Sequence, residues 1–412
     1  MSDDLCPECA TPTISERSAE PWCPSCEWNL DRFDPEHGRH LGWARVDRRL
    51  YRAAYWLTAR QFAELAGGPA AGASKSAARL VTIAASALLL AGEVALVVLG
   101  VWLLLKDFFS PVNILGVLVL AVAVVLRPRL GRLRDLTAEA TEVDRGTAPA
   151  LFGLIERVAA ATGAPMPDVV LMGAEQNAYT VTVGLRRRRV LYLGAPLWAV
   201  LDPQERVALV GHELGHFVNG DVRRGLLTQS ARSTLGQVAY LLTPDRGGDL
   251  VAQIVEFVGW VFSRLALGFQ LLLLWTSLRD SQRAEYLADE LAAKAGGSAA
   301  TIRLLDSFLI TDAVDTVVRR EARAKQGAEA WRAAAGVART RLEPQVAAMR
   351  QLSRRTDVSL FASHPPAGLR AALTATRPEQ PAAVVLPETD SARIDEELAA
   401  HYERARRELA TA

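Results

Sequence analysis

Two histidines and a glutamate near the middle of the chain are spaced for metal chemistry. The segment H-E-L-G-H, from His212 to His216, places two imidazoles four residues apart, on one face of a helix. Both could bind one zinc ion, with Glu213 beside the metal as a base that takes a proton from water. The alternative is two solvent-facing histidines on an amphipathic helix. The flanking residues are mostly apolar, however, and a buried glutamate between two histidines needs a compensating charge.

Two histidines leave a peptidase zinc site one protein ligand short. Further along the chain, Glu285 and Asp289 lie one helical turn apart. We predict that Glu285 is the third ligand and that Asp289 accepts a hydrogen bond from His212, which holds that imidazole in the right tautomer. Two acids at this spacing more often form a solvated helix face, so this prediction depends on the upstream histidine motif.

The cysteines near the N-terminus form a second candidate metal site. They occur as two C-x-x-C pairs, a pattern typical of a zinc ribbon, in which the metal is structural and supplies folding energy that so short a segment lacks. A redox pair would instead be a single C-x-x-C in a larger α/β domain. Trp22 and Trp28, with few basic neighbours, favour a protein partner for the ribbon over nucleic acid. The four predicted ligands are Cys6, Cys9, Cys23 and Cys26.

Apolar runs predict a membrane anchor. Residues 80–105 are apolar apart from Glu93 and are long enough to cross a bilayer, and a shorter apolar run follows at 112–126. Arginines lie before and after this pair of apolar runs, whereas the turn between the runs contains a single basic residue, Lys106. The positive-inside rule therefore predicts a transmembrane hairpin with both ends in the cytoplasm. Two buried helices of a soluble domain are the alternative.

The elements around the histidine motif predict a mostly α fold with a small β-sheet, that is, an α+β fold. We expect a helix over 135–165, and a helix start at Asp202, where Pro203 follows the cap and Glu205 lies three residues after it. A second apolar region, 225–278, predicts either a membrane hairpin or two amphipathic helices against the catalytic domain. We expect short strands at Asp168–Met172, Tyr179–Val183 and Val190–Leu193, with a G-L-R-R-R-R hairpin between the last two.

Three segments together resemble one family. The stretches ERVALVGHELGHFVNGDV, SQRAEYLADELA and SHPPAGLR are similar to the membrane gluzincins, which include the bacterial HtpX heat-shock proteases, the CAAX prenyl-protein endoproteases and the mitochondrial OMA-type proteases. The resemblance covers roughly 135–375, and Asp221 completes the first motif. It implies a zincin-like fold and cytoplasmic endopeptidase activity. It also implies zinc binding by His212, His216 and Glu285, with Glu213 catalytic.

The resemblance implies further site residues. Asn177 and Ala178 match the family's Asn-Ala pair on an edge strand, where a substrate backbone adds as an extra strand; a turn is the alternative for Asn177. His364 would stabilise the oxyanion of the tetrahedral intermediate, unless it is an ordinary loop histidine. Arg370 ends the same segment and would contact substrate. The family commonly has an acidic residue between the prolines and this arginine, whereas residues 367–369 are Ala-Gly-Leu.

The sequence therefore predicts five parts. They are a four-cysteine zinc ribbon at 1–30, a juxtamembrane helical linker at 31–79, a transmembrane hairpin at 80–126, a zinc peptidase domain at 127–375 with an apolar helical hairpin insert at 225–278, and an exposed, charged C-terminal tail at 376–412.

We expect a multi-pass inner-membrane zinc endopeptidase with its catalytic domain and N-terminus in the cytoplasm. No signal peptide precedes the cysteines, so we expect them to stay in this reducing compartment and not to form disulfides. It would bind one catalytic and one structural zinc ion and cleave membrane or misfolded proteins. The net charge of +1 gives no argument for a nucleic-acid partner. The alternative is a membrane-tethered zinc-ribbon adaptor with a silent peptidase fold. The complete set of candidate metal-site residues favours the enzyme.

Overall fold

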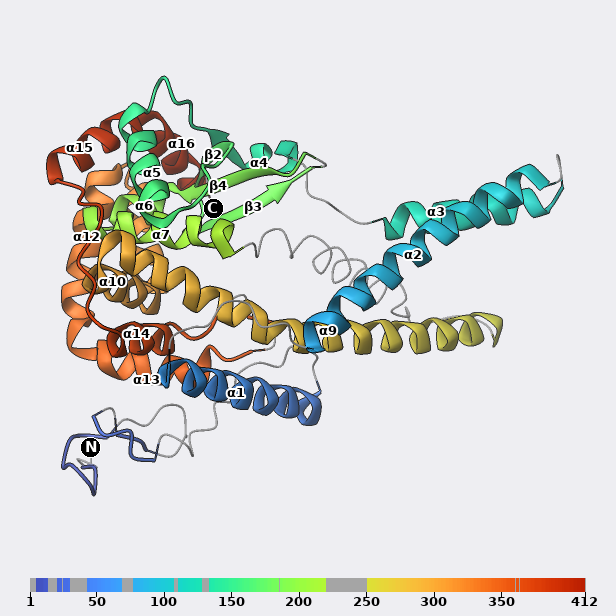
Figure 1. Ribbon diagram of the computed structural model, residues 1–412, viewed down its shortest axis with the longest axis horizontal. Coiled ribbons are helices and arrows are strands. Elements are labelled where there is room, and N and C mark those ends of the chain that lie inside the picture. The colour runs from blue at the N-terminus through green and yellow to red at the C-terminus, as the bar shows by residue number, and fades with distance from the viewer. Residues whose placement is uncertain are drawn as a thin grey trace. The chain divides into compact units, whose positions relative to one another are not determined.

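The computed structural model describes most of the chain (Figure 1). The described residues are 5–13, 21–23, 25–29, 43–68, 77–106, 110–127, 133–184, 186–219, 250–359, 361–362 and 364–411. Asp221 and the first half of the predicted apolar insert lie outside them. The chain divides into two compact units: Met1–Ala70, Arg132–Val222 and Ser281–Ala412 form the first, and Ala71–Gly131 and Arg223–Asp280 form the second.

A four-stranded sheet lies in the first unit, in the order β1-β2-β4-β3. β2 and β4 pair in parallel, whereas β1 pairs with β2, and β3 with β4, in antiparallel fashion, so β3 is an edge strand. The three predicted strands and the hairpin between the last two are confirmed. The strands are β1 (Ala140–Glu142), β2 (Val169–Gly173), β3 (Ala178–Val183) and β4 (Arg188–Gly194).

The predicted single helix over 135–165 is wrong. The segment instead forms helix α4 (Leu133–Glu139), strand β1 and helix α5 (Pro149–Thr162). The break has a local cause: the Asp144 carboxylate accepts hydrogen bonds from the backbone N–H groups of Gly146 and Thr147, which closes a turn. A proline at the first position of α5 then starts a new helix.

Both faces of the sheet are covered. On one face, Val170, Met172 and Leu191 belong to a large apolar core that also contains residues of α5, α6 (Ala195–Val200) and α7 (Pro203–Asn219). On the other face, Leu171 and Tyr192 pack in a smaller cluster with α4. Because side chains alternate between the two faces of the sheet, each face has its own cluster. The helix with the histidine motif packs on the face that belongs to the larger core.

Helix α7 begins as the sequence predicts. The Glu205 carboxylate accepts a hydrogen bond from the backbone N–H of Asp202, at 3.1 Å, which is the reciprocal half of a capping box. Further along α7, a Cβ added to Gly211 would lie 2.9 Å from the Cβ of Ala295, and one added to Gly215 would lie 3.1 Å from the Cα of Ala288. Glycine at these two positions lets the backbone of α7 approach the later helix α9 closely.

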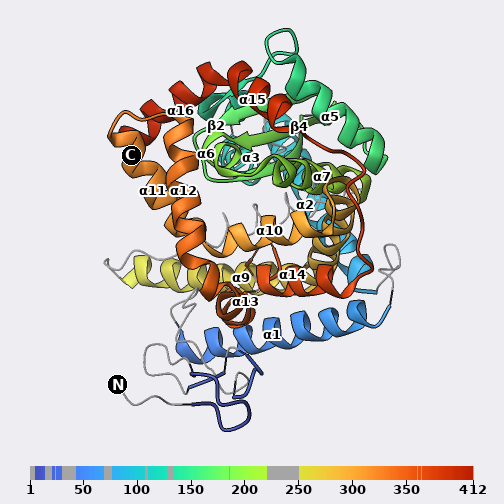
Figure 2. The same cartoon turned by 90° about the vertical axis from the view of Figure 1, so that its left-hand side faces the viewer.

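Helix α9 (Leu250–Gly296) is continuous over 47 residues and belongs to the second unit up to Asp280 and to the first unit from Ser281. The first unit contains further helices. Its other helices are α1 (Ala44–Ala66), α10 (Ser298–Leu309), α11 (Thr311–Arg323), α12 (Ala328–Leu342), α13 (Val346–Thr356) and α14 (Ala367–Thr376), with the 3-10 turn η2 (Glu343–Gln345) before α13. Figure 2 shows α1 alongside α13 and α14.

The C-terminal segment is not the exposed charged helix that we expected. It forms α15 (Glu388–Glu397) and α16 (Ala399–Thr411), and apolar residues in and between these helices, including Ile394, Leu398 and Tyr402, are buried in the large core. The expectation was wrong because the charged residues hide an amphipathic pattern, in which every third or fourth residue is apolar.

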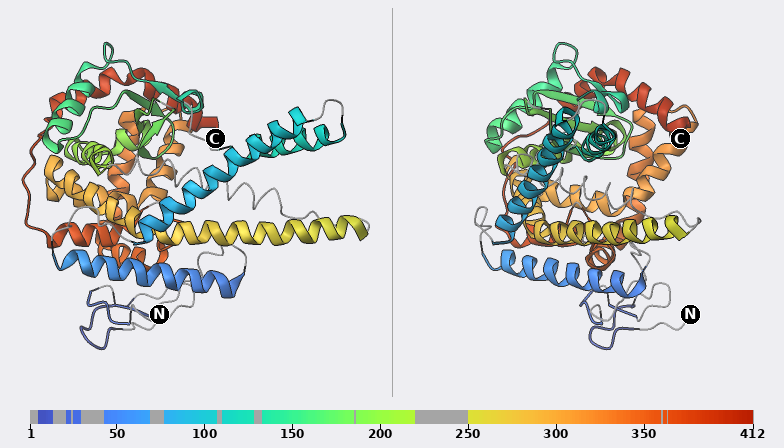
Figure 3. Two further views of the ribbon diagram at one scale, coloured as in Figure 1. Left: turned by 45° about the vertical axis from the view of Figure 1, so that its right-hand side comes forward. Right: turned by 90° about the vertical axis from the view of Figure 1, so that its right-hand side faces the viewer.

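The second unit contains the predicted hairpin, formed by α2 (Ala77–Lys106) and α3 (Val112–Leu126) (Figure 3). Gly100 and Gly116 lie where the two helices cross, since a Cβ on either would lie within 3.2 Å of the other's carbonyl oxygen. The Asn113 amide donates to the carbonyl of Leu104 and closes the turn. By length and composition, Ala87–Lys106 and Gly259–Gly296 could cross a membrane, whereas the apolar stretch in α3 is shorter.

Candidate active site

Helices α7 and α9 bring the three predicted ligands together. His212 and His216 lie one turn apart on α7, with ring centroids 4.9 Å apart, and face Glu285 on α9. One donor atom from each of the three lies within 4.8 Å of the others. His212 and Glu285 are buried, and His216 is mostly buried. The close packing of α7 on α9 therefore carries a carboxylate from far along the chain to the histidine motif.

The spacing of these atoms fits one tetrahedral ion. Nε2 of His212 lies 3.5 Å from Oε2 of Glu285, and Nε2 of His216 lies 3.6 Å from Oε1 of the same carboxylate. Nitrogen and oxygen ligands at 2.0–2.2 Å from zinc lie roughly 3.3–3.6 Å from one another at tetrahedral angles. Two imidazoles and a glutamate also form a known catalytic donor set that leaves a position for water. These residues therefore fit zinc.

Asp289 lies behind the first histidine, as the sequence predicts. Its Oδ1 is 3.0 Å from Nδ1 of His212, and both side chains are buried. In the neutral imidazole, a hydrogen bond there leaves Nε2 as the unprotonated nitrogen that faces Glu285. This arrangement holds the imidazole in the tautomer that a metal ligand needs.

Arg370 is not where we expected a substrate-binding residue. Its guanidinium is buried, with Nε and Nη2 donating to the two oxygens of Asp289 at 2.8 and 2.7 Å. Its Nη1 also lies 3.6 Å from Glu285. Sequence reasoning missed this pairing, although a buried Asp289 needs a cationic partner and Arg370 lies in the later segment of the same family resemblance.

The His364 side chain lies next to Glu285, the predicted third ligand. Its Nδ1 is 2.6 Å from Oε2 of Glu285, and about half of the side chain is exposed. Glu213 is buried on α7, one residue after the first histidine, and its backbone carbonyl accepts a hydrogen bond from Thr180 of β3 at 3.1 Å. The edge strand β3 is thereby fastened to the helix that carries the motif.

Asn177 and Ala178 lie at the start of the edge strand. The Asn177 carbonyl accepts from the N–H of Gly194 on β4, so the alternate residues Ala178, Thr180 and Thr182 direct their backbone groups away from β4. The Asn177 side chain accepts from the N–H of Ala178 at 2.9 Å. A strand could therefore add beside β3 from Ala178 onwards.

The charges of the site favour a cation. Burial opposes the ionisation of both carboxylates, yet His364 and His216 lower the pKa of Glu285, and Arg370 lowers the pKa of Asp289. Burial and Arg370 act against a charged His212, but Asp289 and Glu285 outweigh them and raise its pKa to about 9. A buried centre that keeps two carboxylates ionised and attracts a proton to its histidine suits a divalent ion.

The four cysteines also meet, at a separate place in the first unit. Their sulfur atoms all lie within 4.8 Å of one another, with 3.5 Å between Cys6 and Cys26 and 3.4 Å between Cys9 and Cys23. Sulfur ligands at about 2.3 Å from zinc lie roughly 3.8 Å apart at tetrahedral angles, far beyond a disulfide bond of about 2.05 Å. The cysteines are free thiols that fit a tetrahedral metal site.

The two cysteine pairs have the same backbone geometry. In each, the N–H four residues after the first cysteine donates to that cysteine's carbonyl, from Ala10 to Cys6 and from Glu27 to Cys23. Ala10 and Glu27 both have positive φ, 56° and 63°. The repeated turn aims both thiols of a pair at the same point, as a metal knuckle requires.

Comparison with known proteins decides the family. A model of peptidase family M48 matches residues 147–376, which is more than half of the chain and contains both metal-site helices. The chain belongs to peptidase family M48. The match confirms the predicted HtpX-like metallopeptidase class and the α+β fold. M48 peptidases use zinc, in agreement with the donor set of His212, His216 and Glu285.

Individual relatives of this M48 chain are named HtpX proteases. It is 29% identical over 201 residues to a protease HtpX homolog of Desulfotalea psychrophila, covering 44% of this chain and 67% of the relative. It is 28% identical over 152 residues to protease HtpX homolog 1 of Sulfurisphaera tokodaii (34% and 49%). It is 29% identical over 169 residues to protease HtpX of Stutzerimonas stutzeri (38% and 55%). The chain thus spans about half to two thirds of these relatives. No solved structure matches it.

Proposed function

We propose that this chain is a membrane-anchored zinc endopeptidase that cleaves membrane or misfolded proteins on the cytoplasmic side. The observation that carries the proposal is the spacing of 3.5 and 3.6 Å between Glu285 and the Nε2 atoms of His212 and His216. These three residues would hold the catalytic ion. When bound, zinc supplies a Lewis acid that polarises water and lowers its pKa towards ~7.

The reaction then needs a base and an acid. Glu213 accepts a proton from the attacking water and returns it to the nitrogen of the leaving amine. His364 would bond Glu285 through Nδ1 and use Nε2–H to stabilise the developing oxyanion. Its half-exposed position beside Glu285 supports this role, because an oxyanion donor must reach both the ligand set and the substrate.

The substrate would bind as an added strand. Its backbone would pair with the edge of β3 from Ala178 onwards, and Thr180 would keep that edge in register with the helix that carries Glu213. The Asn177 side chain, which accepts a hydrogen bond from the N–H of Ala178, would mark the start of β3 as the place where this pairing begins. Arg370 takes no part in substrate binding in this proposal, since its bonds to Asp289 keep it buried.

We further propose that the α2–α3 hairpin and the apolar part of α9 cross the inner membrane, with the N-terminus and the peptidase in the cytoplasm. Large apolar side chains on both α2 and α3 are exposed, as a lipid environment requires. The four cysteines would hold a second, structural zinc ion, and the ribbon would contact a protein partner. The remaining domain boundaries stay as predicted from the sequence, except that 376–412 and helix α1 of the predicted linker belong with the peptidase.

The test uses the full chain in detergent and its Glu213→Gln form. We expect both to contain the same amount of zinc by mass spectrometry, and the variant to cleave casein at least about 100-fold more slowly, because it lacks the general base. A chelator should abolish cleavage by the normal chain. Zinc with no chelator-sensitive cleavage in the normal chain would favour the alternative, a silent adaptor. Full activity of the variant would refute the role of Glu213.

A further inference from the structure

Helix α1 has two different faces. Asp47, Ala54, Thr58, Gln61 and Leu65 are buried, and their spacing forms one stripe along the 23-residue helix. This stripe packs on α14 and on the active-site end of α9. The match to the M48 family begins only at residue 147, so α1 is an addition to the matched peptidase core.

The buried face fastens α1 close to the metal-site residues. The Gln282 amide, three residues before Glu285, donates to the Thr58 hydroxyl at 2.7 Å, and both side chains are buried. At the end of the helix, Leu65 packs with Tyr286 of α9 and Leu373 of α14. α1 is therefore a fixed part of the peptidase rather than a free linker.

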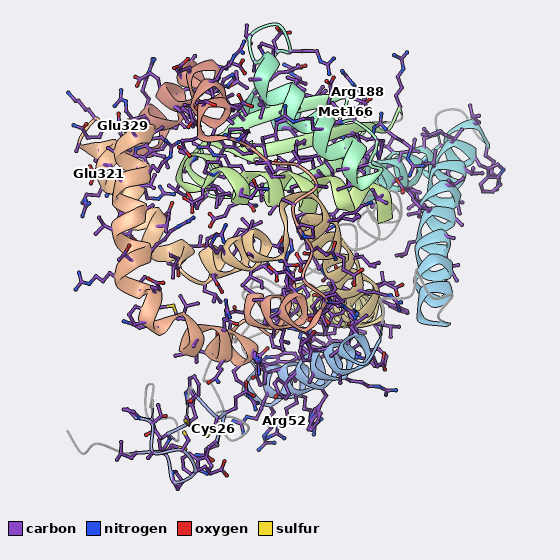
Figure 4. The ribbon with its side chains drawn as sticks, turned by 60° about the vertical axis from the view of Figure 1, so that its left-hand side comes forward. Cys26, Arg52, Met166, Arg188, Glu321 and Glu329 are labelled. Atoms are coloured by element: carbon purple, nitrogen blue, oxygen red, sulfur yellow. The ribbon has the colours of Figure 1, made fainter. Side chains whose placement is uncertain are left out.

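The opposite face is cationic. Arg45, Arg48, Arg49 and Arg52 are exposed at helical spacing, and among the described residues no ion pair neutralises any of them. Trp56, on the same face, is 70% exposed. Figure 4 shows Arg52 on the side of α1 away from α14. An exposed tryptophan beside several arginines is costly in water but well suited to the boundary between lipid headgroups and water.

The position of α1 in the chain selects its partner. Only residues 67–76 separate it from α2, which contains the first candidate span, and ten extended residues reach at most about 36 Å. A cationic surface this close to an anchor meets the lipid headgroups before any other acidic partner, at an effective concentration set by the short connection.

We propose that the Arg45–Arg52 and Trp56 face of α1 binds anionic phospholipid headgroups at the cytoplasmic surface. This inference rests on the proposed membrane anchorage, not on the peptidase chemistry. Because the other face of α1 holds Gln282 and Tyr286, lipid binding fixes the orientation of the active-site helices relative to the bilayer. α1 thereby sets how far from the membrane a substrate is cut.

The experiment places the full chain, in its Glu213→Gln form, in nanodiscs of phosphatidylcholine with or without about 30% phosphatidylglycerol. Brominated lipid quenches tryptophan, and subtracting the signal of a further Trp56→Phe variant isolates Trp56. We expect Trp56 to be quenched only in the anionic discs, and the effect to weaken when salt rises. Replacing Arg45, Arg48, Arg49 and Arg52 by Gln should lower the ratio of lipid-bound α1 to α1 that is not bound to lipid at least about tenfold, as measured by the quenching of Trp56.

The matched control removes the same charge elsewhere. Gln at Arg320, Arg393, Arg404 and Arg407, all exposed on α11, α15 and α16, should leave the quenching of Trp56 unchanged. Equal quenching in both lipid compositions, or normal quenching in the α1 variant, would overturn the proposal. So would binding of an oligonucleotide through the same arginines without any lipid dependence. A chain that fails to enter the discs would refute the anchorage, and this inference with it.

Discussion

Arg370 and Asp289 form a buried, doubly hydrogen-bonded pair, with 2.8 and 2.7 Å between their atoms. The same carboxylate lies 3.0 Å from Nδ1 of His212. Three helices are linked in this way, because α14 supplies the arginine, α9 the aspartate and α7 the histidine. Arg370 therefore acts on the proposed metal ligand through Asp289, as a positioning residue.

Replacing Arg370 by Lys should weaken zinc binding about 10- to 100-fold, because a lysine cannot make two parallel bonds to Asp289 and leaves His212 less well held. Competition with a coloured zinc chelator measures the affinity. Arg377→Lys is the control, since Arg377 bonds Gly68 and Glu290 instead. Unchanged affinity in the Arg370 variant would show that the pair does not position the histidine.

Replacing Cys6 by Ser should remove one zinc ion per chain and leave the other in place. The cysteine cluster loses a ligand and its folding energy, whereas the site on α7 and α9 shares no residue with it. Metal analysis gives the stoichiometry, and limited proteolysis reports whether the ribbon opens. Loss of both ions, or of neither, would contradict two independent sites.

Asp395→Ala should destabilise the peptidase by about 3–5 kcal/mol, because Arg206 is buried and would lose its countercharge. Arg332 bonds the same carboxylate and would lose it too. Chemical unfolding in detergent measures the change. On the same helix, Asp390 is exposed, and its replacement by Ala should cost less than about 1 kcal/mol. Equal effects would mean that the C-terminal helices are not anchored through Arg206.

The Asp168–Arg189 pair should make stability depend on pH. The hydrogen bond and charge of Arg189 lower the pKa of Asp168, so its contribution is present above the ordinary pKa of about 3.9 and is lost as pH falls through the lowered value. The normal chain should have a free energy of unfolding higher than that of Asp168→Asn by under about 1 kcal/mol, because the pair is so exposed. This difference should therefore shrink as the pH falls from 5 to 2. Asp135→Asn, at an exposed position, should show no such trend.

Patterns that act over a few residues were predictable. The capping box at Asp202, the hairpin between β3 and β4 and the two cysteine knuckles depend on neighbouring residues alone, and the structure confirms these elements. The break before α5 was not predicted, because the Asp144 turn competes with helix formation through one side chain.

The sequence by itself determined the chemistry available to this protein: a histidine pair with a glutamate, four cysteines, and apolar runs long enough for a bilayer. Only the tertiary structure decided which residues meet. Arg370 reaches Asp289 across 81 residues, α1 joins Gln282 across 224, and the charged C-terminal helices turn out to be part of the core. The reason is physical. A helix motif needs only its own few residues, whereas a long-range contact is chosen by the packing of whole helices, which no local pattern encodes.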